Sequence, residues 1–195
     1  MPRVSREQAS KNHSVIEEVA ARLFREQGFR GVSVGDLMGA AGLTHGGFYG
    51  HFDSKEALAT VACKKAFEQS KTRVDQRIAL AGERTVARQS MIDNYLTTER
   101  RDNLGDGCPV SAFVSDIARE PVASPLRAAY VDGVKGLLEQ LGALSPAPDE
   151  HTRQDDAIAM LSTMVGALLL SRASASDALS ERILDAVRQH LHAPP

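Results

Sequence analysis

Apolar residues recur at helical spacing near the start of the chain. Ser14 and Glu17 have the spacing of a capping box, and Ser10 offers a slightly earlier start. Gly28 follows the apolar run and favours the end of this helix. Spacing of three and four positions predicts an amphipathic helix. Its apolar face comprises Val15, Ile16, Val19, Ala20, Leu23 and Phe24.

A second, short helix follows at once. Ser33 and Asp36 repeat the capping-box pattern, and Gly42 stands where a left-handed residue commonly ends a helix. Thr44 is then placed to cap a third short helix that runs through His51. The inward face of the second helix is predicted to be Val34, Leu37, Met38 and Ala41.

A fourth helix is predicted to begin with a capping box made by Asp53 and Glu56. Beyond Arg73 the pattern changes to longer helices, interrupted at Pro121 and at Pro146. These helices are expected over residues 84–101, 108–119, 123–142, 151–173 and 177–192. The prediction is an all-α protein.

Two domains are predicted. Residues 1–52 form a small N-terminal domain, the helix over about 53–73 is a bridge, and residues 74–195 form a helical domain. The net charge is -2 and the isoelectric point is near 6.3, so no strong basic excess is present. Residues 1–73 hold 11 Lys and Arg against 8 Asp and Glu, whereas residues 74–195 hold 12 against 17. The modest positive charge therefore lies in the N-terminal part.

Residues 33–52 have the layout of a helix-turn-helix, in which one helix braces a second that enters the DNA major groove. Gly46, Gly47 and Gly50 would each cost about 1 kcal/mol relative to Ala in a helix interior. Close approach of the backbone to phosphates and base edges would offset that cost, because a Cβ there would hold the helix away. The alternative is a compact helical corner in which His45 and His51 are ordinary surface residues.

The predicted recognition segment has an inner and an outer face. Leu43, Phe48 and Phe52 are expected to point into the core. Tyr49 and His51 are suited to donate hydrogen bonds to phosphates, and Lys55 adds a positive charge at a helix N-terminus. Thr44 and His45 are expected to read bases. The predicted DNA-binding residues are Ser33, Thr44, His45, Gly46, Gly47, Tyr49, His51 and Lys55.

The segment GFRGVSVGDLMGAAGLTHGGFYGHFDSKEAL, residues 28–58, resembles the N-terminal domain of the TetR family of one-component bacterial regulators. Similarity beyond it is looser. The resemblance implies a homodimeric repressor that binds double-stranded operator DNA and is released by a small-molecule effector in the C-terminal domain. It also implies that the last two long helices pair with their counterparts. The interface is expected to include Met160, Met164, Ala167, Leu168, Ile183, Leu184 and Val187, which could instead belong to the subunit's own core.

Cys108 is the most distinctive residue of the C-terminal domain. Pro109 at the first helical position makes Cys108 the predicted N-cap, and the positive end of the helix dipole favours thiolate. Cys108 could sense electrophiles or oxidants, although a free Cys is more often a small buried apolar residue. Phe113 and Asp116 are further candidates for an effector pocket, together with Met91 and Tyr95.

Other classes of protein receive little support. The sequence lacks a phosphate-binding glycine loop, a GxSxG motif, an HExxH motif and a CxxC pair. His151 and Asp155 could make half a metal site, but a solvated pair four residues apart is the favoured interpretation, so we expect no enzyme, no cofactor and no metal. Two cysteines and no apolar export segment or membrane span suggest a cytoplasmic protein. The second hypothesis is a helical dimeric scaffold that has lost DNA binding.

Overall fold

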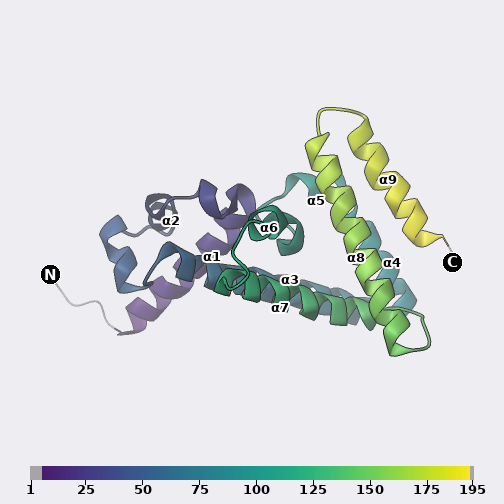
Figure 1. Cartoon of the computed structure of the whole chain (residues 1–195), viewed down its shortest axis with the longest axis horizontal. Helices are drawn as coiled ribbons and strands as arrows, with labels where there is room; N and C mark the ends of the chain where they lie inside the picture. The colour runs from purple at the N-terminus through teal and green to yellow at the C-terminus, as the bar shows by residue number, and fades with distance from the viewer. Residues whose placement is uncertain (1–5, 194–195) are drawn as a thin grey trace.

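The computed structural model describes residues 6–193, and every regular element in that range is a helix. The all-α prediction is therefore confirmed (Figure 1). Residues 1–5 of the predicted N-terminal domain lie outside the described residues. The elements are α1 (Arg6–Gly31), α2 (Val34–Ala40), the 3₁₀ helix η1 (His45–Gly50), α3 (Lys55–Ala81), α4 (Arg84–Tyr95), α5 (Thr98–Asp102), α6 (Pro109–Ile117), α7 (Pro125–Gly142), α8 (Glu150–Ala173) and α9 (Leu179–His192).

The first helix begins earlier than its apolar stripe. The sequence predicts a start at Ser14 or Ser10, but α1 begins at Arg6 and its first turns are exposed. Polar first turns carry no apolar periodicity, so the pattern could not show them. Gly28 has φ 74° and ψ 167°, which interrupts the helical path as predicted, because a left-handed φ suits glycine.

The caps of the short helices are partly as predicted. Ser33 and Asp36 form the reciprocal capping box at the start of α2, and Gly42 has φ 69°. Thr44 occupies the N-cap position of η1, but its side chain makes no capping hydrogen bond, so that part of the prediction is wrong. The predicted third short helix is present as the 3₁₀ helix η1 and not as an α-helix.

Helix α3 differs from its prediction at both ends. Its N-cap is Ser54, whose side chain accepts a hydrogen bond from the Ala57 N–H, rather than Asp53. The helix continues past Arg73 to Ala81 and ends at Gly82, which has φ 73°. It extends from the N-terminal domain into the C-terminal domain (Figure 1).

The helix predicted over 84–101 is two helices. Helix α4 ends at Tyr95, and Thr97 caps α5 by accepting a hydrogen bond from the Arg100 N–H. A threonine side chain that accepts a hydrogen bond from the N–H three residues later starts a new helix. Because this side-chain bond competes with the backbone bonds that would continue the helix, α4 ends before Thr97. Cys108 stands at the N-cap of α6 as predicted, with Pro109 in the first turn.

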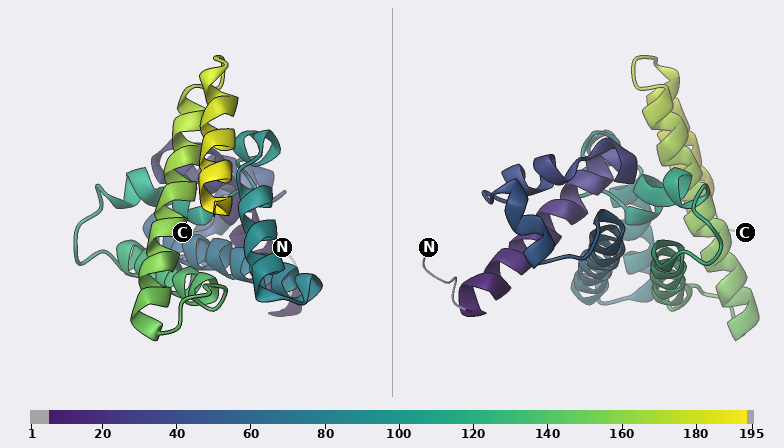
Figure 2. Two further views of the ribbon diagram at one scale, coloured as in Figure 1. Left: turned by 90° about the vertical axis from the view of Figure 1, so that its right-hand side faces the viewer. Right: turned by 60° about the vertical axis from the view of Figure 1, so that its left-hand side comes forward.

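Helices α3 and α7 lie side by side and run in the same direction (Figure 1). Gly133 of α7 receives the ring of Phe67, which a Cβ at that position would overlap. Further along the pair, the Gln140 amide donates hydrogen bonds to the Lys71 carbonyl and to Asp75, at 3.2 and 2.6 Å. Helices α8 and α9 pack together at the end opposite the N-terminal domain (Figures 1 and 2).

The residues predicted to form a dimer interface belong largely to the subunit's own core. Met160, Met164, Ala167, Leu168 and Leu184 are at most 3% exposed, so they are not available to a partner. Ile183 and Val187 are half-buried against the same core. The prediction is wrong for the five buried residues, because an apolar stripe shows that a face is covered without showing by what.

Helix α8 is long and apolar enough, by length and composition, to cross a membrane, whereas the sequence pattern predicts no membrane span. In the structure 44% of its apolar window is buried. Core helices pass the same test, and Met160, Met164 and Leu168 pack among the other helices. One such helix is weak evidence for a membrane span.

Candidate nucleic-acid interface and ligand pocket

The inner face of the helix-turn-helix is as predicted. The Phe48 side chain is fully buried, Phe52 is 6% exposed, and Leu43 is half-buried against the core. The Leu43 N–H donates to the Met38 carbonyl at 2.8 Å and closes the turn between α2 and η1. These contacts fix the orientation of η1, and its other face is left to solvent.

The outer face of η1 carries the predicted contact residues. Tyr49 is 71% exposed, and its ring meets Phe48 edge-on at a centroid distance of 5.2 Å. Thr44, His45 and Gly46 are exposed, whereas Gly47 is half-buried. An aromatic side chain anchored at its base, with its hydroxyl free in solvent, is suited to contact a large partner.

The fold itself does not require glycine on this face. A Cβ at Gly46 or Gly50 would meet nothing within 4 Å, and one at Gly47 would make only ordinary contacts. Among the described residues, positive φ occurs at Gly28, Gly42 and Gly82 and not in η1. The glycines of η1 therefore leave an outward surface free of side chains.

Two helix N-termini flank η1. Ser33 is exposed at the N-cap of α2, but its hydroxyl already donates to Asp36 at 2.6 Å and accepts from the Asp36 N–H at 3.1 Å. Hydrogen bonds from Ser33 lower the pKa of the Asp36 carboxyl. Lys55 is the first residue of α3, where its charge adds to the positive end of the helix dipole.

His51 is less open than predicted. It is half-buried, and its ring lies 6.0 Å from that of His13 on α1. The His13 ring stacks on Phe52 at 4.4 Å and pairs with Glu17 at 3.2 Å. His13 is not among the predicted contact residues, although its spacing of four from Glu17 places the two side chains on one helix face.

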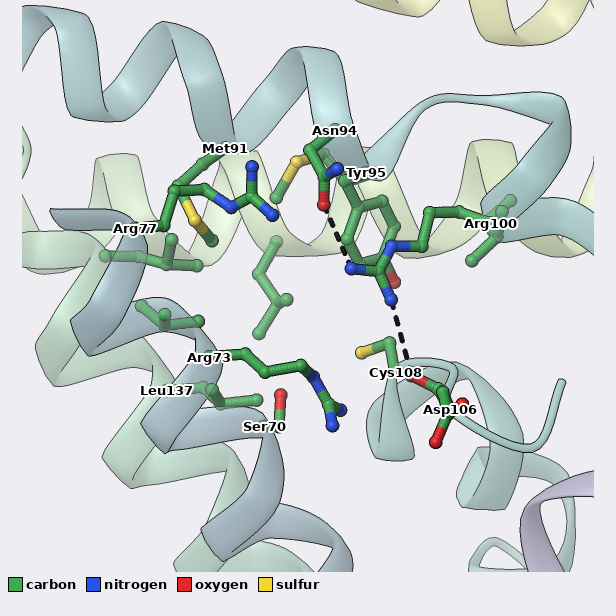
Figure 3. A pocket seen from close by; sticks show the side chains of 15 residues that line it. Ser70, Arg73, Arg77, Met91, Asn94, Tyr95, Arg100, Asp106, Cys108 and Leu137 are labelled. Atoms are coloured by element: carbon green, nitrogen blue, oxygen red, sulfur yellow. Dashed lines mark hydrogen bonds between the residues drawn. The ribbon is translucent and has the colours of Figure 1, made fainter. Parts of the chain in front are cut away.

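A pocket opens between α3, α4, α8 and the loop before α6, with about 720 Å³ of empty space including its open mouth. Met91 and Tyr95 line it as predicted (Figure 3). Its remaining walls are formed by Ser70, Arg73, Val74, Arg77, Asn94, Arg100, Asp106, Cys108, Leu137, Leu141, Leu161, Met164 and Leu168.

Phe113 and Asp116 do not line this pocket, which corrects their prediction. The Phe113 side chain is fully buried, and its ring lies 4.7 Å from that of Phe29 on α1. Asp116 accepts a hydrogen bond from the Phe29 N–H at 2.8 Å. Both residues join α6 to the end of α1, because the face of α6 that carries them points toward the N-terminal domain.

Cys108 lines the pocket, as its prediction requires, and is half-buried. The hydroxyl of Tyr95 is buried beside Cys108 and Ser111 and completes no hydrogen bond with any described residue. Burial, followed by the proximity of Cys108, raises the pKa of Tyr95. The pocket therefore holds an unsatisfied hydroxyl next to a thiol.

The loop before α6 contacts both domains. The Arg100 guanidinium donates to the Asp106 carbonyl at 3.3 Å from the pocket side. On the other side, Arg25 of α1 donates to the Gly105 carbonyl. Burial lowers the pKa of Arg25 to about 10, and the nearby charge of Arg73 acts in the same direction. Among the described residues, no group of three or more His, Cys, Asp or Glu is arranged to hold a metal ion.

Residues 16–61, which contain the helix-turn-helix, match the family described as bacterial regulatory proteins, tetR family. This N-terminal part of the chain is therefore similar to the TetR family of regulators. The match covers the surface described above and stops within α3.

Two curated TetR-family regulators are similar to this chain. The HTH-type transcriptional repressor DhaR of Mycobacterium sp. (strain GP1) is 29% identical over 110 residues, which are 53% of this chain and 54% of DhaR. The HTH-type transcriptional repressor KstR2 of Rhodococcus jostii (strain RHA1) is 49% identical over 49 residues, 25% of this chain and 24% of KstR2. The matches span about half or less of these relatives.

Solved structures resemble the chain over nearly its whole length. The E. coli NemR reduced form has a TM-score of 0.78 at 17% identity, covering 95% of this chain and 98% of that one. A TetR transcriptional regulator from Chloroflexus aurantiacus J-10-FL has a TM-score of 0.76 at 25% identity, covering 95% of this chain and 94% of that one. The C-terminal helices thus have the fold of such regulators, although their sequence has diverged.

Proposed function

We propose that this protein is an operator-binding transcriptional repressor that acts as a homodimer and is released by a small-molecule effector. The observation that carries the DNA-binding part is the outer face of η1. Its glycines serve no packing need inside the fold, and Tyr49 projects beside them.

DNA reading is assigned to the predicted residues with two refinements. Thr44, His45 and Tyr49 are exposed and contact DNA directly, and the backbone at Gly46 and Gly47 approaches the duplex. Lys55 and the N-terminus of α3 bind a phosphate. Ser33 and His51 contribute less, because Ser33 is held by Asp36 and His51 is half-buried.

The proposed DNA-binding surface carries no excess of positive charge that would attract the phosphates. Between residues 33 and 56, Lys55 is the one Lys or Arg, whereas the acidic residues are Asp36, Asp53 and Glu56. Affinity then depends on backbone and side-chain hydrogen bonds more than on basic charge, and the salt dependence of binding should be modest for a DNA-binding protein.

The dimer is assigned to the surfaces of α8 and α9 that the subunit leaves uncovered. Ile158, Leu170 and Leu179 are 49%, 60% and 49% exposed on these helices. Burial of such side chains against a second copy would remove apolar area from water. Sedimentation equilibrium should give twice the chain mass, and a monomer at micromolar concentration would contradict the assignment.

Effector release requires a ligand that favours the DNA-incompetent state, and operator binding must weaken ligand binding by the same factor. The pocket beside Cys108 is the proposed effector site. The loop before α6 contacts both the pocket and α1, and Asp116 of α6 contacts the end of α1. A shift of α6 on ligand binding would therefore move the N-terminal domain.

The function is tested by fluorescence anisotropy with the promoter region upstream of the protein's own gene. We expect saturable binding that is outcompeted by the same unlabelled DNA and poorly by scrambled DNA. Tyr49→Phe and Lys55→Ala should weaken binding to all sequences, whereas His45→Ala should also relax base preference. Binding to no promoter fragment, with a folded dimer present, would favour the alternative function of a helical scaffold.

A further inference from the structure

Three guanidinium groups point into the pocket from two separate elements. Arg73 and Arg77 lie one turn apart on α3, and Arg100 comes from α5 (Figure 3). Asp106 is the one acidic residue among the described residues that line the pocket. The lining therefore carries an excess of positive charge.

Two of these arginines have no partner among the described residues. Arg100 donates to the Asn94 side chain at 3.0 Å and to the Asp106 carbonyl, whereas no hydrogen bond or ion pair of Arg73 or Arg77 is formed within the described part of the chain. Burial lowers the pKa of Arg73 and of Arg77, and the charge of Arg100 lowers both further. Half-buried like charges without acceptors are costly unless a bound anion satisfies them.

The rest of the pocket is apolar. The residues that form this apolar wall come from α3, α4, α7 and α8 and are Val74, Met91, Leu137, Leu141, Leu161, Met164 and Leu168. The unsatisfied Tyr95 hydroxyl adds one further donor. Arg73 and Arg77 also line a second hollow with the exposed Leu80 and Val86, which places them at the mouth of the pocket.

We propose that the effector is an organic anion, a carboxylate with an apolar body, and this inference rests on the proposed function. The carboxylate binds Arg73 and Arg77, because planar guanidinium groups match a carboxylate's two oxygens. The apolar body extends toward Leu137 and Met164. A neutral molecule of the same shape would leave the arginines unpaired.

Isothermal titration calorimetry of the full chain without DNA tests the ligand class. The probes are decanoate and 1-naphthoate, their neutral amides, and acetate as an anion without an apolar body. We expect at least one of the two apolar carboxylates to bind about ten-fold or more tightly than its amide, which is the effect of a charge-assisted hydrogen bond. Acetate should bind far more weakly.

Arginine variants test which residues contact the carboxylate. Arg77→Gln and Arg73→Gln should each weaken carboxylate binding about ten-fold and reduce the preference over the amide. Arg84→Gln is the matched control, because Arg84 is exposed on α4 and does not line the pocket. The unliganded Arg73 and Arg77 variants should melt no lower than the wild type, since each loses a like-charge repulsion.

Three outcomes would each overturn the proposal. The carboxylate and its amide could bind with equal affinity, or the folded arginine variants could bind the carboxylate as tightly as the wild type. The third outcome is that neither apolar carboxylate binds. Fluorescence anisotropy with operator DNA distinguishes a failure of the ligand proposal from a failure of the proposed function. Carboxylate binding by a protein that binds no operator would refute the regulator and leave the ligand class standing. Operator binding by a protein that binds none of the carboxylates would refute the ligand class alone.

Discussion

The Asp116 carboxylate on α6 accepts a hydrogen bond from the backbone N–H of Phe29, 2.8 Å away on α1. The left-handed φ of Gly28 interrupts α1 immediately before Phe29, so this N–H has no helical partner and is free to donate. A Cβ at Gly28 would lie 2.7 Å from the same carboxylate. The interruption and the carboxylate together join the two domains.

Removing this carboxylate should loosen the junction. Asp116→Ala leaves the part-buried Phe29 N–H without an acceptor and should lower the free energy of unfolding by about 1–3 kcal/mol. Urea denaturation measures the loss, and amide exchange should speed up at Phe29. Ser115→Ala, on the exposed face of the same helix, is the control and should change stability by less than about 0.5 kcal/mol. Equal effects of the two changes would contradict the role of Asp116.

The glycines of η1 should separate stability from DNA binding. Gly46→Ala and Gly50→Ala add a Cβ that meets nothing within 4 Å, so thermal stability should stay the same or rise by about 0.5–1 kcal/mol. Operator affinity should nevertheless fall, because the Cβ holds the segment away from the duplex.

Gly136→Ala in α7 is the matched control, since it also meets no neighbour and is remote from η1. It should leave operator affinity unchanged. If Gly46→Ala and Gly50→Ala bind the operator like the wild type, η1 does not approach DNA closely.

The two cysteines should differ in reactivity. Cys108 is half-buried at the pocket, whereas Cys63 is fully buried. A maleimide at pH 7.5 should modify Cys108 alone in the native protein and both cysteines in urea, as read by mass spectrometry. If Cys108 is a sensor, electrophile-induced operator release is lost in Cys108→Ser while operator affinity without the electrophile persists. A mutant that is released like the wild type would leave Cys108 a packing residue.

Burial raises the pKa of the Cys63 thiol from 9.0 to about 12. The unfolded chain loses this proton at lower pH than the folded one, so the stabilising contribution is complete below about pH 9 and is lost as the pH rises toward 12. Cys63→Ala should therefore unfold with a weaker pH dependence in that range, measured by urea titration against Cys108→Ala. Parallel curves for the wild type and Cys63→Ala would refute the shift.

The sequence determined the features that depend on a few neighbouring residues. The capping box of Ser33 and Asp36, the left-handed Gly28 and Gly42, and the start of α6 after Cys108 all followed from local pattern. Caps and turns act within about four residues, so a single chain segment contains their cause. The helix-turn-helix was predictable for the same reason.

Tertiary structure decided which faces meet. Arg77 and Arg100 are far apart in the sequence and meet at one pocket, and Asp116 reaches Phe29 across 87 positions. It also buried Met160 and Leu184 inside the subunit, where the sequence allowed an interface. An apolar stripe fixes that a helix face is covered, but the covering element is selected by the packing of the whole chain, which no local pattern encodes.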